Sequence, residues 1–153
     1  MVQASDLEFD RSVLGVEVRG EPQPITKEHV AAFCESIGDT NPLYTDEEAA
    51  KSGPYGGLVA PVAFWGALEI PDPPDPQINF GNSSVGGGRH CTFDDVMRVG
   101  DTITPVTFIA EIYEKTGRSG RMVFVVRRTK LINQRDESIA VVDQITIRRN
   151  VEE

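Results

Sequence analysis

Four segments rich in Val, Ile, Thr and Phe fill most of the C-terminal half of the chain and constrain its fold more than any other feature. They comprise residues 89–96, 102–114, 122–132 and 139–148. β-Branched and aromatic residues favour extended strands. Turn-forming residues, G-R-S-G at 117–120 and N-Q-R-D at 133–136, separate the last three segments. The pattern predicts an antiparallel meander.

The N-terminal half shows helical spacing after a short strand expected at residues 13–18. A first helix is predicted between Thr26, a suitable N-cap, and Gly38, a suitable end. The capping-box pattern T-D-E-E at residues 45–48 predicts a second, short helix. Residues 58–70 are apolar nearly all round and predict a longer helix buried on several sides. The prolines that follow end it, and residues up to about 88 are expected to form a loop that is most mobile at the triple glycine.

An apolar helix followed by an antiparallel sheet predicts an α+β domain whose sheet wraps around that helix. The length of 153 residues and the hydrophobic content of 39% suit one domain over residues 1–153. The net charge of -9 argues against a nucleic-acid-binding or anionic-membrane surface. No apolar run is long enough to span a membrane and the N-terminus lacks signal-peptide features, so the cytoplasm is the expected compartment.

The two cysteines, Cys34 and Cys91, stand apart from each other in apolar surroundings. No Cys-x-x-Cys spacing or Cys/His cluster accompanies them, so we expect buried, reduced thiols and no metal site.

Three motifs resemble those of one family. Residues 37–46 read I-G-D-T-N-P-L-Y-T-D, residues 55–61 read Y-G-G-L-V-A-P, and residues 98–102 read R-V-G-D-T. The first is similar to the hydratase signature of MaoC-like enoyl-CoA hydratases and dehydratases, usually G-D-x-N-P-x-H-x-D. The second resembles the entry to their central helix, and the third the turn before their long strands. The resemblance spans roughly residues 26–148 and implies a hot-dog fold, an antiparallel sheet around a long central helix.

In that family an Asp and a His activate water, which adds to the double bond of a 2-enoyl thioester, while a backbone N–H polarises the carbonyl. Position by position, Asp39 and Asn41 match the signature, but Tyr44 stands where the histidine is expected. A phenol is protonated at neutral pH and is a poor base. Ala60 and Pro61 replace the family's His-Gly, and proline has no N–H to donate.

The missing histidine and the missing N–H donor at one site imply a subunit that binds substrate, while a partner subunit performs the proton transfers. The motif sequences are most similar to those of the N-terminal MaoC-like type, which is the non-catalytic partner. The resemblance implies an acyl-CoA or acyl-carrier-protein thioester as ligand, no cofactor, and a second hot-dog subunit, more in keeping with a different chain than with another copy. The substrate-binding residues that it implies are Gly57, Ala60, Pro61, Phe64, Trp65 and His90.

Two other functions remain open at this point. The chain could be a self-sufficient hydratase or thioesterase that uses Asp39 with Tyr44 or His90, or a non-enzymatic module that binds acyl thioesters. Each of these residues also has an ordinary structural role available: Asp39 in a turn, Tyr44 as a packed aromatic, His90 on a strand surface. Arg127 and Arg128 point to opposite faces of a strand, so a clamp for CoA phosphates could use only one face.

The acyl group is not identified by the sequence. Steroid, long-chain and polyketide-type acyl groups all suit a subunit whose site has lost its catalytic groups, and the length of the acyl tunnel depends on the loop at residues 71–88.

Overall fold

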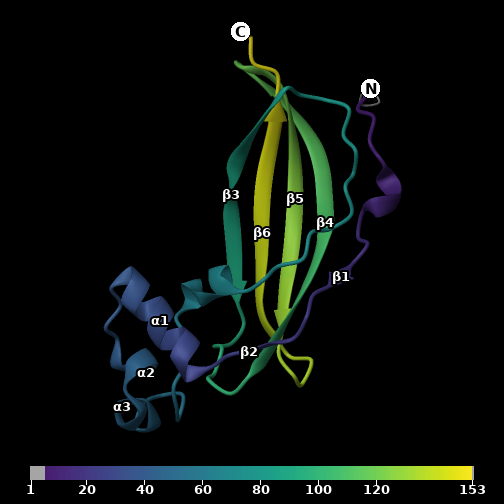
Figure 1. Cartoon of the computed structure of the whole chain (residues 1–153). Helices are drawn as coiled ribbons and strands as arrows, with labels where there is room; N and C mark the ends of the chain where they lie inside the picture. The colour runs from purple at the N-terminus through teal and green to yellow at the C-terminus, as the bar shows by residue number, and fades with distance from the viewer. Residues whose placement is uncertain (1–5, 153) are drawn as a thin grey trace.

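The computed structural model describes residues 6–152, and a twisted antiparallel sheet dominates it (Figure 1). The long strands are β3 (Ser83–Phe93), β4 (Thr102–Gly117), β5 (Gly120–Ile132) and β6 (Ser138–Arg149). Two short strands, β1 (Val18–Arg19) and β2 (Gln23–Pro24), both pair with β4. The strand order is β1-β4-β5-β6-β3. The predicted meander is confirmed for β4, β5 and β6, with β3 crossing over to pair with β6.

The triple glycine was expected in a loop, and this was wrong: Gly86, Gly87 and Gly88 lie within β3. The strand begins at Ser83 because its backbone pairs with β6 along almost its whole length, from Ser83 opposite Arg149 to Phe93 opposite Ala140. The missing side chain matters most at Gly87, where a Cβ atom would come within 2.7 Å of the Ile147 side chain.

The first helix is confirmed as α1 (Lys27–Ile37). The Thr26 side chain accepts a hydrogen bond from the His29 N–H, and Gly38 ends the helix in a left-handed conformation. The second prediction is confirmed as α3 (Glu47–Lys51), with Asp46 as its N-cap, and a single extra turn, α2 (Pro42–Thr45), precedes it.

The long helix expected over residues 58–70 is absent. The segment instead contains a six-residue 3-10 helix, η2 (Val62–Ala67), between extended residues. Val59 forms a β-bridge with Arg98, and Ala60 donates its N–H to the carbonyl oxygen of Met97, so tertiary pairing holds this part extended. Ile70 precedes a proline, which disfavours helical backbone there as well.

The strand expected at residues 13–18 is also largely replaced. A 3-10 turn, η1 (Arg11–Val13), begins at Asp10, whose side chain accepts from the Ser12 N–H. Leu14 makes an isolated bridge to Ile109, and only Val18 and Arg19 form a regular strand.

Two apolar clusters lie toward opposite ends of the sheet. One joins α1, η2 and the ends of the strands and includes Ile25, Val30, Phe64, Ile103 and Leu131. The other joins the N-terminal segment, the sheet and residues 71–82, here called the strap, and centres on Leu7, Ile78 and Val123. Figure 1 shows the strap crossing the sheet after η2 and running beside β4 before β3 begins. None of the helices within residues 6–152 is long and apolar enough to cross a membrane.

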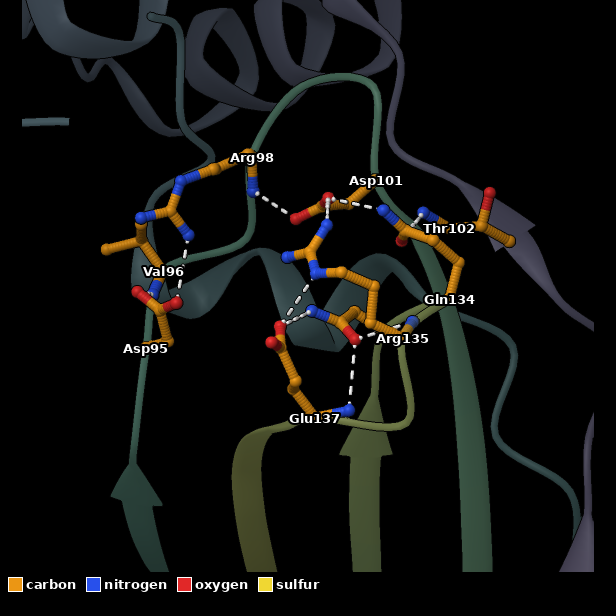
Figure 2. A network of polar contacts seen from close by, with 9 residues as sticks. Asp95, Val96, Arg98, Asp101, Thr102, Gln134, Arg135 and Glu137 are labelled. Carbon is orange, nitrogen blue, oxygen red and sulfur yellow. Dashed lines mark hydrogen bonds and ion pairs between the residues drawn. The ribbon is translucent and has the colours of Figure 1, made fainter. Parts of the chain in front are cut away.

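A polar network ties the β3–β4 turn to the β5–β6 turn (Figure 2). Asp101, only 5% exposed, accepts from the Arg98 N–H at 3.1 Å and from Gln134 Nε2 at 3.0 Å. Gln134 in turn accepts from the Thr102 N–H at 2.9 Å. The third motif of the sequence therefore has a structural task here, because its buried carboxylate joins two turns that are about thirty residues apart in the chain.

Candidate functional site

The first motif runs from the last residue of α1 through α2, and its residues 38–41 form the turn between the two helices. Asp39 follows Gly38 and donates its N–H to the carbonyl oxygen of Cys34 at 2.9 Å. Its Oδ1 accepts from the Asn41 N–H at 3.0 Å, and Asn41 Oδ1 accepts from the Leu43 N–H at 3.0 Å. Both side chains thus hold the chain in place as it enters α2. The turn role considered for Asp39 is the one that its contacts show.

Tyr44 lies half-buried against the cluster beside α1 and η2. Burial raises the pKa of its phenol, and the nearby Asp39, Cys34 and Tyr55 raise it further. Burial and Asp39 also raise the pKa of the Cys34 thiol. The structure therefore brings Asp39 and Tyr44 together, in a setting where Tyr44 stays protonated at neutral pH and cannot accept a proton from water.

No backbone N–H is available where a carbonyl-polarising donor was expected. Ala60 is 4% exposed, and its N–H is donated to Met97 at 2.8 Å. Pro61 has none, and Phe64 donates its N–H to the Pro61 carbonyl oxygen at 2.9 Å. Only a short 3-10 helix follows, so fewer aligned peptide dipoles would aid an oxyanion than in a long α-helix.

The remaining predicted residues fall into separate places. Phe64 is buried and packs edge-on against Phe33, with ring centroids 5.3 Å apart. Trp65 is half-buried, and the guanidinium of Arg89 lies 5.4 Å from its ring centroid. Gly57 lines a different hollow, beside Glu47 and Lys51.

His90 lies on the opposite face of β3 from Arg89, because successive strand residues alternate. In the sheet it pairs with Asp143, which pairs with Arg128. The Arg128 guanidinium donates twice to the Asp143 carboxylate, at 2.7 Å each. Hydrogen bonding to Arg128 holds the Asp143 pKa below its usual value, against a smaller effect of burial, and His90 adds to the lowering. The structure does not bring His90 to the side of Trp65.

Two hollows were not predicted, one beside α1 and one on the inner face of the sheet, which is the face that the strap crosses. One, of about 590 Å³, lies between α1, β2 and η2 and is mostly apolar. Its lining residues are Gln23, Pro24, His29, Ala32, Phe33, Phe64, Ala67, Leu68 and Glu69. The second, of about 430 Å³, runs under the strap and is here called the strap groove. Its lining includes Arg127 and Arg148, and the alternation of Arg127 with Arg128 was the one sequence signal that pointed to this face.

The part of the chain that the structure describes contains no set of side chains suited to bind a metal ion. No group of three or more His, Cys, Asp and Glu side chains there is placed to hold an ion. Cys34 is buried and Cys91 half-buried, and both are free thiols.

A family model for the FAS1-like dehydratase domain region matches residues 12–142 of the chain. The UPF0336 protein of Streptomyces avermitilis is 32% identical over 102 residues, which cover 63% of this chain and 68% of that protein. The UPF0336 protein of Saccharopolyspora erythraea is 25% identical over 151 residues, 95% of this chain and 94% of that protein. The second alignment takes in nearly the whole chain.

Solved structures show the same fold. The MaoC-like dehydratase of Rhodospirillum rubrum has a TM-score of 0.68 at 20% identity, covering 92% of this chain and 94% of that one. A chain of the ChsH1-ChsH2 complex of Mycobacterium tuberculosis has a TM-score of 0.70 at 18% identity, covering 88% and 86%. HadBC, a 3R-hydroxyacyl-ACP dehydratase complex of the same organism, gives 0.66 at 18%, covering 90% and 98%. The α+β fold is the hot-dog fold, here with a shortened central helix.

Proposed function

The chain belongs to the family of FAS1-like dehydratase domain regions, and from this premise we propose that it is the substrate-binding, chemically silent half of a heteromeric hydro-lyase. The reaction is hydration of an enoyl-CoA, or dehydration of a 3-hydroxyacyl thioester carried on CoA or an acyl carrier protein. A second hot-dog subunit with an intact Asp and His supplies the proton transfers.

One observation supports the proposal: the residues at the motif positions of the base and of the carbonyl-polarising donor do not supply those groups. Tyr44 has a raised pKa and stays neutral, so it does not replace the family's histidine as a base. The Ala60 N–H is already donated to Met97 and Pro61 has none, so neither motif position offers a donor to the thioester oxygen. General base and oxyanion donor each contribute large factors to such reactions.

A partner subunit suits the open edge of the sheet. β3 ends the strand order and pairs only with β6 in the described chain. Nearly all its residues are exposed, including Val85 at 37% and Phe93 at 39%. A free edge of eleven residues is a template for another strand. Heteromeric complexes among the related folds, HadBC and ChsH1-ChsH2, support a partner that is a different chain.

The short η2 also suits a binding role. A long central helix would fill the space against the inner face of the sheet. Here the apolar hollow lies between the short η2 and α1, beside Phe33 and Phe64, and the strap groove lies on the inner face. Concave, largely apolar hollows of a few hundred cubic ångströms are typical ligand sites. An acyl chain therefore has room on this subunit while its thioester faces the partner's catalytic groups.

The test compares the purified chain alone with the chain co-expressed with a hot-dog protein that carries the intact motif. Consumption of an enoyl-CoA series is followed by the absorbance of the enoyl thioester. We expect turnover only from the complex. Asp39→Asn and Tyr44→Phe should leave that turnover within about twofold, since neither side chain touches the reacting atoms, whereas Asp→Asn in the partner's motif should abolish it.

Other outcomes would favour the alternatives. Turnover by the chain alone that Asp39→Asn abolishes would show a self-sufficient hydratase. Hydrolysis of saturated acyl-CoA, seen as released thiol, would show a thioesterase. Binding of acyl-CoA without turnover in any hot-dog complex would show a non-enzymatic binding module.

A further inference from the structure

Four arginines share the inner face of the sheet, which packs against η2 and the strap. Arg121 pairs with Glu114 and Asp6, and the other three are Arg89, Arg127 and Arg148. Arg89, Gln144 and Arg127 form one row across β3, β6 and β5. Arg148 lies four residues beyond Gln144 on β6 and thus on the same face. Arg127 and Arg148 both line the strap groove. Three cations besides Arg121 on one face stand out in a chain with a net charge of -9.

Few carboxylates lie near Arg89, Arg127 and Arg148 to neutralise their charges. Arg127 Nη1 donates to Asp72 Oδ1 at 2.9 Å and its Nη2 to the Pro71 carbonyl at 2.8 Å. Arg148 donates to the Ile78 carbonyl at 2.9 Å, and Arg89 lies over Trp65. Across residues 6–152, Asp72 is the one carboxylate within ion-pair distance of any of the three.

The pair between Arg127 and Asp72 is easily exchanged. The Asp72 side chain is 90% exposed and that of Arg127 26% exposed. Ion pairs that include a fully hydrated carboxylate contribute little free energy. Arg127 Nε is buried and has no hydrogen-bond partner, so the guanidinium is not fully used. A carboxylate that enters the groove can take the place of Asp72.

We propose that the strap groove binds a carboxylate at the far end of the acyl chain, so that the substrate class is the thioester of a dicarboxylic acid. This inference rests on the proposed function and specifies its acyl group. Arg127 binds the carboxylate, and Arg148 adds a second positive charge along the same groove. Methylene groups contact the apolar part of the lining, which comprises Pro73, Pro76, Ile78, Ile109 and Val125.

A carboxylate fits this site better than a phosphate of coenzyme A. Asp72 and Asp75 also line the groove. Replacing Asp72 by a ligand carboxylate exchanges one negative charge for another, whereas a phosphate dianion would enter beside Asp75 with an extra charge. Arginine forms paired hydrogen bonds to a planar carboxylate with favourable geometry.

The experiment titrates the full-length chain with glutaryl-CoA, pentanoyl-CoA and free coenzyme A, and separately with glutarate and pentanoate. Trp65, the one tryptophan of the chain, contacts Arg89 on this face and reports binding by its fluorescence. We expect glutaryl-CoA to bind about tenfold more tightly than pentanoyl-CoA, as a charge-assisted hydrogen bond implies. Arg127→Gln should remove this preference, and Arg128→Gln, on the opposite face, should keep it. Asp72→Asn, an exposed change that leaves the fold intact, should tighten glutaryl-CoA binding by about threefold because it removes the competing carboxylate.

Equal affinity for glutaryl-CoA and pentanoyl-CoA, or a preference that survives Arg127→Gln, would overturn the inference. So would an Arg127→Gln effect of the same size on free coenzyme A, because the anion would then be a phosphate. Failure of the proposed function would give a different result from failure of the carboxylate site. If glutarate but not pentanoate stabilises the chain against heat in an Arg127-dependent way while no thioester binds, the carboxylate site stands and the thioester function falls.

Discussion

Tyr44 and Asp143 illustrate how surroundings decide what a titratable side chain does. Tyr44 occupies a position at which a base was expected, and burial beside Asp39 moves its pKa further from neutrality. Asp143 is drawn the other way by two hydrogen bonds from Arg128. Neither environment could be predicted from residue type alone, because each depends on neighbours that other elements supply. Asp39, Asn41 and Tyr44 could be located from their motif, but their roles could not.

Asp143→Asn should lower the free energy of unfolding by about 1–2 kcal/mol at pH 7, as expected for a half-exposed, charge-assisted pair. The native pKa of Asp143 lies below its ordinary value of 3.8, so this stabilisation is complete above that pH and is lost as the pH falls through the native pKa. Urea unfolding at pH 7 and at pH 3 measures it. The gap between wild type and variant should be narrower at pH 3.

The control for this effect is Glu35→Gln on the exposed side of α1, which should change the unfolding free energy by less than about 0.5 kcal/mol. A gap between wild type and Asp143→Asn that widens toward pH 3 would contradict the assignment of the lowered pKa to the Arg128 pair.

Among the elements, those with a strong local pattern could be predicted and those held by distant pairing could not. Strands β4, β5 and β6 and helix α1 have clear periodicity and end signals, and they match the prediction. Residues 58–70 are apolar in either conformation, and it is the bond from Ala60 to Met97 that makes the first part extended. The triple glycine looks like a linker in isolation and becomes a strand only because β6 lies beside it.

Two adjacent glycines of β3 should respond oppositely to alanine. Gly87→Ala should destabilise the chain by about 1 kcal/mol or more, since its Cβ would meet Ile147 at 2.7 Å. Gly86→Ala meets nothing within 4 Å and should leave stability unchanged or raise it by about 0.5 kcal/mol through the unfolded state. Thermal and urea unfolding of both variants decide the point. Equal losses would mean that β3 is not paired as described.

The network around Asp101 yields a prediction for the two joined turns. Asp101→Asn should lower the unfolding free energy by about 2 kcal/mol, because buried donors from Arg98 and Gln134 would face an amide in place of a carboxylate. Asp136→Asn, whose side chain is 85% exposed in the same region, should change it by less than about 0.5 kcal/mol. Urea unfolding with both variants tests this, and a loss no larger for Asp101 than for Asp136 would refute the role.

Taken as a whole, the molecule has its two apolar clusters toward opposite ends and leaves the strap groove and the β3 edge accessible. The strap groove depends on this arrangement, since Arg127 meets Asp72 from 55 residues away in the chain. Such a site could not be predicted from sequence, because the path of the strap over the sheet determines which side chains meet. The only sequence signal for this site was that Arg127 and Arg128 point to opposite faces of β5.

Val85→Lys should weaken binding to a hot-dog partner by about tenfold or more, because a lysine on an open edge opposes the addition of a strand. Val85 is 37% exposed on β3, so the stability of the chain alone should change by less than about 0.5 kcal/mol. Val16→Lys, 44% exposed and outside β3, is the matched control and should leave partner binding intact. Titration calorimetry with the co-expressed partner measures both. Unchanged binding by Val85→Lys would place the interface elsewhere.

The eleven-residue edge of β3 has a consequence for the life of the protein in a cell. A newly made copy whose edge stays uncovered offers a ready strand template to its own kind and to other nascent chains. Surplus copies are therefore natural clients of chaperones and proteases, and the amount of this protein that accumulates follows the supply of whatever covers that edge. If the proposed second hot-dog subunit covers the edge, balanced synthesis of the two chains, in time and in number, limits this exposure.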